Sequence, residues 1–186
     1  MLRRLVLLIG AVALAFSAVA AEVGGVKLDD KTSVGGQDLV LNGAGIRTRV
    51  FIKVYVASLY LPAKAADVTA VLAKAPRRIQ MNLLRDLSGD QLVGALNDGL
   101  KDNNSEAEMA AVKAQAEQMT SIMKGFGEVK EGNVVALDFV DGMTRISLNG
   151  AAKGSIAGEA FNKALTRIWL GDKPVQADLK KAMLGG

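Results

Sequence analysis

Residues 39–62, LVLNGAGIRTRVFIKVYVASLYLP, are the stretch of the chain that decides its fold. Sixteen consecutive residues, 46–61, contain neither glycine nor proline, and more than half of them are β-branched or aromatic types that favour strands. The pattern predicts one long strand, or two strands joined by a bulge, that follows a glycine turn at Gly43 and Gly45 and ends at Pro62. Because the stretch is too apolar for a free edge, we expect it inside a sheet.

Four polar side chains of this strand form the first candidate site. Strand side chains alternate between faces, so a straight strand would present one row of Arg47, Arg49, Lys53 and Tyr55. The fork of N–H groups on arginine matches a carboxylate, and the row therefore predicts a surface that binds an anion. The alternative is an ordinary solvated sheet face. A bulge between Arg47 and Tyr55 would place the two side chains on different faces.

The first 20 residues are typical of a secretory signal peptide. A basic start and an apolar run precede small residues that predict cleavage after Ala20 or Ala21. No later segment is apolar over enough residues to predict a transmembrane span. We therefore expect a periplasmic protein whose residues 21–186 form a single domain.

The composition excludes several kinds of chemistry. The chain has no cysteine and no histidine, which rules out a Ser-His-Asp triad, a cysteine nucleophile and metal sites made of thiolates or imidazoles. No loop has the spacing of carboxylates that binds calcium, so we expect neither a metal nor a cofactor. Without residues 1–20 the chain keeps 21 basic and 19 acidic side chains, and a net charge of +2 does not predict binding to nucleic acid.

The rest of the chain predicts grouped strands and helices rather than an alternation of the two. Asp141-Gly142 between two apolar runs predicts a two-residue hairpin, in which Asp138 would face Arg145 and form an ion pair. The other expected elements are a helix at 66–75, a strand at 77–85, helices opened by capping boxes at Ser88 and Ser105, a helix at 155–170 and a short helix from Pro174 to Met183. This order predicts an α+β fold, an antiparallel sheet with a layer of helices on one face.

The helix expected at 105–124 carries Met109, Met119 and Met123 on its apolar stripe. Methionines at this spacing are usually part of a core, and we favour that interpretation. The alternative is a lining that adapts its shape to a flexible apolar ligand.

Three motifs together resemble the chalcone isomerase-like family, in its exported bacterial branch. The first is Gly43-Ala44-Gly45-Ile46-Arg47 followed by Phe51-Ile52-Lys53 and Leu59-Tyr60-Leu61, and it is similar to the glycine turn and long strand of the family. The second, Ser105-Glu106-Ala107-Glu108, resembles the start of its long helix. The third runs from Gly171 to Lys180 and resembles its C-terminal segment. The resemblance implies an open-faced β-sandwich with a ligand cleft between sheet and helices.

The resemblance also implies roles for individual residues. Arg47 matches the arginine that steadies the anionic oxygen of the substrate in true chalcone isomerases. Tyr55 stands where the family has a threonine that lines the cleft. Two further polar groups of the enzymes are missing, since a tyrosine is replaced by Asn103 or Asn104 and a threonine by Ile168.

These departures favour a non-catalytic protein that binds a small amphiphilic anion, similar to a fatty acid. The ligand would contact Arg47 and Tyr55, and Arg49 or Lys53 would assist. One alternative is an isomerase of the chalcone isomerase type that works with Arg47 and Tyr55 alone. The other is a structural or partner-binding periplasmic protein whose cleft is filled by its own side chains; the sequence names no protein partner.

Overall fold

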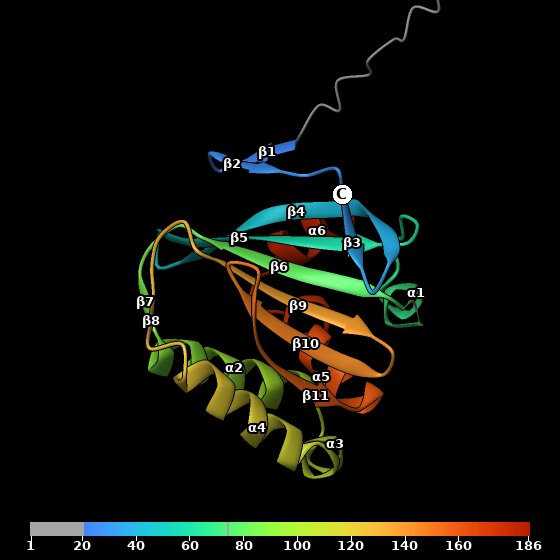
Figure 1. The fold of residues 1–186 in the computed structure, drawn as a ribbon, viewed down its shortest axis with the longest axis vertical. Coiled ribbons are helices and arrows are strands. Elements are labelled where there is room, and N and C mark those ends of the chain that lie inside the picture. The colour runs from blue at the N-terminus through green and yellow to red at the C-terminus, as the bar shows by residue number, and fades with distance from the viewer. Residues whose placement is uncertain (1–20, 74) are drawn as a thin grey trace, which may run out of the picture.

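A computed structural model describes residues 21–73 and 75–186, and the expected signal peptide, residues 1–20, lies outside them. Its centre is an antiparallel sheet of seven strands in the order β11-β10-β9-β6-β5-β4-β3 (Figure 1). The strands are β3 (Lys31–Val34), β4 (Gln37–Arg49), β5 (Ile52–Leu61), β6 (Arg77–Leu83), β9 (Val134–Val140), β10 (Met143–Leu148) and β11 (Ala151–Ala157). Two short pairs lie outside the sheet, β1 (Ala21–Val23) with β2 (Val26–Leu28), and β7 (Leu87–Ser88) with β8 (Glu128–Val129).

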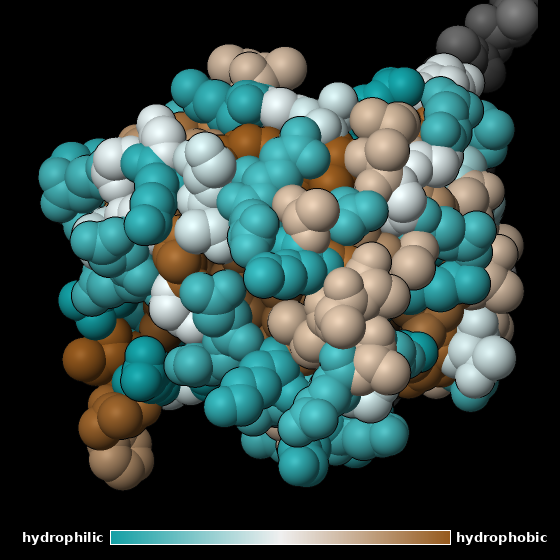
Figure 2. Space-filling view, turned by 90° about the horizontal axis from the view of Figure 1, so that it is seen from below, coloured by the Kyte–Doolittle hydropathy of each residue, from teal (hydrophilic) through white to brown (hydrophobic). Residues whose placement is uncertain are grey.

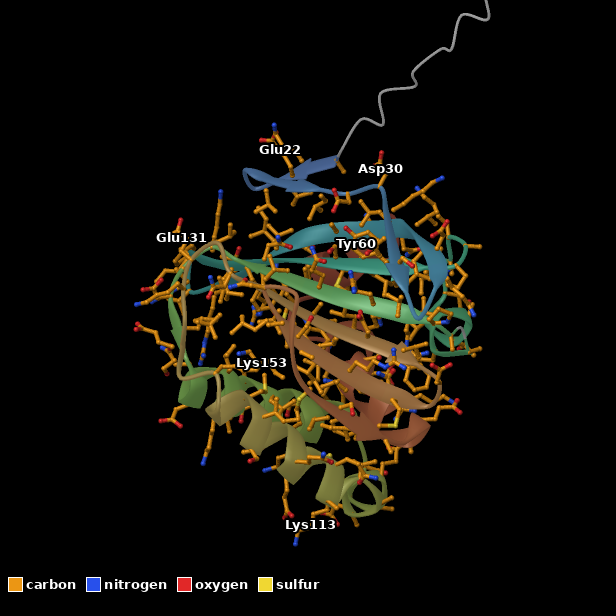
Figure 3. The ribbon with its side chains drawn as sticks, viewed as in Figure 1. Glu22, Asp30, Tyr60, Lys113, Glu131 and Lys153 are labelled. Atoms are coloured by element: carbon orange, nitrogen blue, oxygen red, sulfur yellow. The ribbon has the colours of Figure 1, made fainter. Side chains whose placement is uncertain are left out.

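The main helices cover one face of the sheet, as Figure 1 shows. They are α2 (Gly89–Asn103), α4 (Lys113–Lys124) and α5 (Glu159–Leu170), with the shorter α1 (Val68–Ala73), α3 (Glu106–Ala111) and α6 (Ala177–Met183). Figure 3 shows Lys113, where α4 begins, on the side of the helical layer that lies away from the sheet. The α+β fold expected from the sequence, an antiparallel sheet with helices on one face, is confirmed. In the part of the chain that is described, no helix is long and apolar enough to cross a membrane.

The stretch expected as one long strand is a hairpin instead. It consists of β4 and β5, which lie side by side inside the sheet and are joined by Val50 and Phe51. Both turn residues have positive φ, 47° at Val50 and 64° at Phe51. Such turns normally carry Asn-Gly, so two bulky apolar residues gave no turn signal.

The prediction of a glycine turn at Gly43 and Gly45 is wrong, because both residues lie within β4. The two glycines serve helix packing: α6 lies so close to β4 that a Cβ atom on Gly43 would come 2.1 Å from the backbone oxygen of Ala182. A Cβ atom on Gly45 would come 2.9 Å from the Cβ of the same alanine. Their missing side chains therefore bring the C-terminal helix onto the strand that carries Arg47.

The second hairpin has the predicted register, with Leu137 opposite Ile146, Phe139 opposite Thr144 and Asp138 opposite Arg145. The expected ion pair between Asp138 and Arg145 is wrong. Asp138 accepts two bonds from Arg78 on the neighbouring strand β6, at 2.6 and 2.7 Å, and Arg145 pairs with Asp141 at the turn. Nε and Nη2 of Arg78 each donate to one oxygen of Asp138, and this pair is 19% and 16% exposed, whereas the side chain of Arg145 is 50% exposed.

Several helix boundaries also differ from the expectation: the helix expected at 66–75 spans Val68–Ala73, and the last helix begins at Ala177 rather than at Pro174. Residues 155–157 belong to β11, and helix α5 begins only at Glu159 because Gly158, at a φ of 119°, breaks the chain direction. The helix expected over 105–124 is divided at Val112 into α3 and α4. Both capping boxes, at Ser88 and Ser105, are present as predicted.

The core lies between the sheet and α2, α4 and α5. The strand residues that face the helices alternate as expected, with Ile79, Met81 and Leu83 buried on β6. Met119 and Met123 of α4 are buried against them, as favoured from the sequence. A smaller cluster around Tyr60 lies on the opposite face of the sheet (Figure 3).

One charged side chain is buried in this core. Arg77 of β6 lies over the ring of Phe139, with its guanidinium carbon 4.5 Å from the ring centre, and donates to the side chain of Asn162 on α5. Burial lowers the pKa of Arg77 to about 10, so the group keeps its charge at neutral pH. These contacts hold α5 against the sheet.

Candidate functional site

A cavity of about 440 Å³ lies between the sheet and the helical layer. Strands β4, β5, β6 and β9 form one wall, and α2, α4 and α5 form the other. Most of its lining is apolar, and this part consists of Val50, Ile52, Val54, Met81, Leu87, Leu92, Ala95, Leu96, Met119, Met123, Leu137, Leu165, Ile168, Trp169 and Val175. Met119 and Met123 thus belong both to the core and to the cavity wall, so the two interpretations of the methionines are compatible.

The basic groups and the tyrosine of the cavity gather near the β4–β5 turn, and Gln91 and Asp98 of α2 are the other polar side chains of the lining. Arg47 and Tyr55 are cross-strand partners, and Arg49 lies two residues beyond Arg47 towards the turn. Leu83 pairs with Tyr55, so Arg85, which also lines the cavity, lies farther towards the same end. The cavity therefore has a basic end and an apolar interior.

A bulge in β5 brings Arg47 opposite Tyr55. Arg49 pairs with Ile52 and Thr48 with Lys53, but the next pair skips Val54, so that Tyr55 takes the position opposite Arg47. Both Val54 and Tyr55 then line the cavity. A bulge within one continuous strand would have placed Arg47 and Tyr55 on different faces, but the two residues lie on neighbouring strands and pair with each other.

The four residues predicted to share one face are thus only partly brought together. Arg47, Arg49 and Tyr55 line the cavity, whereas Lys53 is exposed and does not line it. The hairpin explains this difference, since Lys53 pairs with Thr48 and both point away from the face that carries Arg47 and Arg49.

Hydrogen bonds fix the position of Arg47. Its Nη1 donates to the backbone oxygen of Thr48 at 2.6 Å and to the Oε1 of Gln176 at 3.4 Å. Gln176, directly before α6, also accepts from the Thr48 N–H and donates to the Ile46 oxygen. The guanidinium also interacts with the hydroxyl of Tyr55, so the charge of Arg47 and the phenol lie together at the cavity wall.

Tyr55 presents a proton to the cavity. Its hydroxyl accepts a hydrogen bond of 3.1 Å from the indole Nε1 of Trp169 on α5. Burial raises the pKa of Tyr55, and the bond from Trp169 and the positive charge of Arg47 oppose that rise. The phenol stays neutral at neutral pH and keeps an O–H group that can donate to a ligand.

The residues that stand in place of the threonine and tyrosine of the enzymes lie in different surroundings. Ile168 lines the cavity, so this part of the wall is apolar. Asn103 and Asn104 do not line it, because their side chains bond to backbone oxygens of Gly99 and Leu100 in their own helix. Neither asparagine therefore takes the place of the missing tyrosine in the cavity wall.

Sequence reasoning missed Arg85 and Gln176. Arg85 continues the alternation of Ile79, Met81 and Leu83 along β6. Extending this alternation by two residues would have predicted that Arg85 lies on the face towards the helices. Gln176 gave no signal, since its contact with β4 depends on how α6 packs on the two glycines.

A family model matches the sequence of this chain, and a solved structure resembles its fold. The family model described as chalcone isomerase-like matches residues 20–185. No curated protein matches the sequence. Among solved structures, the Arabidopsis thaliana fatty-acid binding protein AtFAP1 is similar with a TM-score of 0.65 and 14% sequence identity, over 86% of this chain and 92% of that chain. At this identity the likeness shows a shared fold.

Proposed function

The chain belongs to the chalcone isomerase-like family and has its open-faced sandwich fold, and from this premise we propose that it binds a fatty-acid-like anion without catalysing a reaction. The acid group would lie at Arg47 and Tyr55, and the hydrocarbon chain would extend into the apolar interior. We further propose that it does so after export to the periplasm, where removal of residues 1–20 would leave the binding domain.

One observation carries this proposal: an apolar cavity has a fixed arginine and a tyrosine hydroxyl at its basic end. Its volume of about 440 Å³ lies within the range of about 300–1,000 Å³ that is common for ligand sites. An amphiphilic anion matches both parts, since a carboxylate can accept from Arg47 and from Tyr55 while its chain replaces water at the apolar wall. The name of AtFAP1, a fatty-acid binding protein of the same fold, agrees with this ligand class.

The apolar wall also suits a flexible ligand. Met81, Met119 and Met123 line it, and unbranched methionine side chains adapt to chains of different length. We therefore expect selectivity for the acid group to exceed selectivity for chain length.

The test is calorimetric titration of the purified mature protein with palmitate, beside native mass spectrometry of the same sample. Arg47→Gln removes the charge that holds the carboxylate, and we expect it to weaken binding by about tenfold or more. The matched control is Arg145→Gln, an exposed arginine on β10 that does not line the cavity. Equal affinity of the two variants, or wild-type protein that neither carries nor takes up a fatty acid, would contradict the proposal. The intact mass also tests whether residues 1–20 have been removed.

An isomerase of the chalcone isomerase type is the second candidate, because Arg47 and Tyr55 lie together in the cavity. The hydroxyl missing at Ile168 argues against it. Incubation with a chalcone decides between the candidates: turnover that both Arg47→Gln and Tyr55→Phe reduce would establish the enzyme, and absence of turnover in protein that binds palmitate would exclude it. A purely structural protein would be expected to fill the cleft with its own side chains, and an open cavity at Arg47 speaks against that alternative.

A further inference from the structure

The β4–β5 turn exposes three large hydrophobic side chains at the end of the molecule. Val50 is 79% exposed, Phe51 98% and Ile52 50%. Figure 2 shows a brown projection at its lower left edge, on the side where this turn lies in Figure 1. Folding of residues 21–186 leaves this apolar surface in water, which is unfavourable unless something covers it.

The backbone of the turn adds a second cost. Val50 and Phe51 both adopt left-handed conformations, at φ of 47° and 64°. A β-branched residue in this region is rare, and turns of this kind favour Asn-Gly. The other two-residue turns of the sheet follow the rule, with Gly35-Gly36 before β4, Asp141-Gly142 before β10 and Asn149-Gly150 after it. Val50 and Phe51 are therefore unfavourable in two ways, because apolar side chains are exposed to water and bulky residues adopt a left-handed backbone. Such strain is typical of functional segments.

Positive charge surrounds the exposed turn. Residues 47–53, RTRVFIK, contain three basic side chains and no acidic one, and Arg85 lies at the same end of the cavity. Among the described residues, none of these four cations takes part in a salt bridge. On the adjoining loops Asp86 and Glu128 are both paired with Lys130, Glu131 lies on the same side of the molecule (Figure 3), and Asp98 is the single acid of the cavity lining.

An apolar projection with basic neighbours is complementary to an anionic lipid surface. The apolar side chains can enter the headgroup region while Arg49 and Lys53 remain at the level of the phosphates. A stable contact between two protein copies requires about 600 Å² or more on each partner, and three side chains on a convex turn do not supply that area. The charge and the shape therefore favour a bilayer over a second protein.

The turn also lies at the opening of the cavity. Val50 and Ile52 are exposed to solvent and line the cavity at the same time, which places its entrance beside them. We propose that the β4–β5 turn inserts into an anionic lipid bilayer and brings the cavity entrance against the membrane. Binding to a membrane is a property separate from the binding of a ligand in the cavity, and it is measured without a ligand present.

The experiment is flotation of the purified protein with vesicles of phosphatidylglycerol and phosphatidylcholine, compared with vesicles of phosphatidylcholine alone. The decisive variant is V50N/F51G, which removes the apolar side chains and supplies the preferred turn residues. We expect it to fold with a thermal midpoint at or above that of the wild type and to lose vesicle binding by more than about tenfold. Because stability is expected to be kept or gained, loss of binding cannot be ascribed to unfolding.

A second pair of variants tests the charge. R49Q/K53Q is expected to weaken binding to the anionic vesicles by about tenfold or more, and added salt should weaken wild-type binding. The matched control is R145Q/K153Q, which removes two cations from β10 and β11, away from the turn; we expect it to bind as the wild type does. Lys153 is visible in Figure 3.

Three results would overturn the proposal: wild-type protein that ignores anionic vesicles, equal binding by V50N/F51G, or a wild-type dimer that V50N/F51G dissociates. Palmitate binding is measured in a separate sample without vesicles. If the protein binds anionic vesicles but takes up no palmitate, the membrane proposal stands and the proposed ligand is refuted. If it binds palmitate but ignores the vesicles, the ligand proposal stands and the membrane proposal is refuted.

Discussion

At the scale of single residues, Gly43 decides how close α6 comes to β4. The backbone oxygen of Ala182 occupies the space that a side chain at this position would need. Gln176, directly before α6, reaches Arg47 and the backbone around it only because the helix lies so close. The absence of a side chain at Gly43 thus allows α6 to pack on β4 and, through Gln176, helps to orient Arg47.

Gly43→Ala is therefore expected to lower the free energy of unfolding by about 1–3 kcal/mol or more, because backbone on both sides must move. The matched control is Gly94→Ala on α2, where a Cβ atom would meet nothing within 4 Å. There the same change should raise the free energy of unfolding by about 0.5–1 kcal/mol, since alanine favours a helix. Urea denaturation measures both, and a neutral Gly43→Ala would mean that α6 is free to shift.

Individual residues of the cavity could be predicted to different extents. Arg47 and Tyr55 stood out because a charge and a phenol interrupt an apolar strand. Their pairing across two strands was not foreseen, since it depends on a turn without turn residues and on the bulge at Val54. Arg85 was within reach of the alternation along β6, whereas Gln176 depends on tertiary packing alone.

At the scale of secondary-structure elements, an ion pair joins α3 to α5. Glu108 closes the capping box of α3 by accepting from the N–H and hydroxyl of Ser105, and it also accepts from the Nη1 of Arg167 at 2.7 Å. The backbone bond from Ser105 and the charge of Arg167 lower the pKa of Glu108 from 4.5 to about 2. The carboxylate form is thus favoured by folding.

This shift predicts how stability depends on pH. Because the pKa of Glu108 is lower in the folded chain, its contribution is complete above 4.5 and is lost as the pH falls towards about 2. Glu108→Gln should therefore be less stable than the wild type at about pH 6 and should approach it at about pH 2. Denaturation across this range measures the difference. The control is Glu106→Gln, which changes a neighbouring carboxylate outside this ion pair. When it is introduced into both the wild type and Glu108→Gln, the pH-dependent difference in stability between these two proteins should stay unchanged.

Elements with ordinary end signals were predicted well. Asp141-Gly142 marked the second hairpin with the correct register, and both capping boxes marked helix starts. The first hairpin was missed because Val50 and Phe51 are the opposite of turn residues. Strand β11 was missed because Ile156 and Ala157 extend the apolar spacing of α5 backwards, and the glycine that ends the strand lay inside an apparently continuous helix.

At the scale of the whole molecule, the cavity lies within the same core that holds the sheet and helices together. Its wall includes Leu96, Met119 and Ile168, which are also buried members of that core. A ligand in this position contacts both layers at once. Occupancy should therefore stabilise the entire fold, not only the residues at the entrance. The α+β class was predictable because it follows from the order of apolar segments, while the size of the cavity depends on side-chain packing that no local pattern encodes.

This coupling predicts a thermal shift. If palmitate is the ligand, a free concentration about 100 times its Kd adds about 2.7 kcal/mol to the free energy of unfolding. For a chain of this length we expect Tm to rise by about 5–10 °C. Differential scanning calorimetry with and without palmitate measures the shift, and Arg47→Gln should show less of it at the same palmitate concentration. An unchanged Tm at this concentration would show that palmitate does not bind the folded chain.

The bond between Trp169 and Tyr55 has a consequence for optical measurements. Trp169 is the one tryptophan of the 186 residues, it is 5% exposed, and it lines the cavity. All indole emission of the protein therefore arises from the cavity wall, beside the hydroxyl that a bound acid would engage. A molecule that enters the cavity changes the polarity around this single fluorophore, so the protein carries an intrinsic, label-free reporter of its own occupancy.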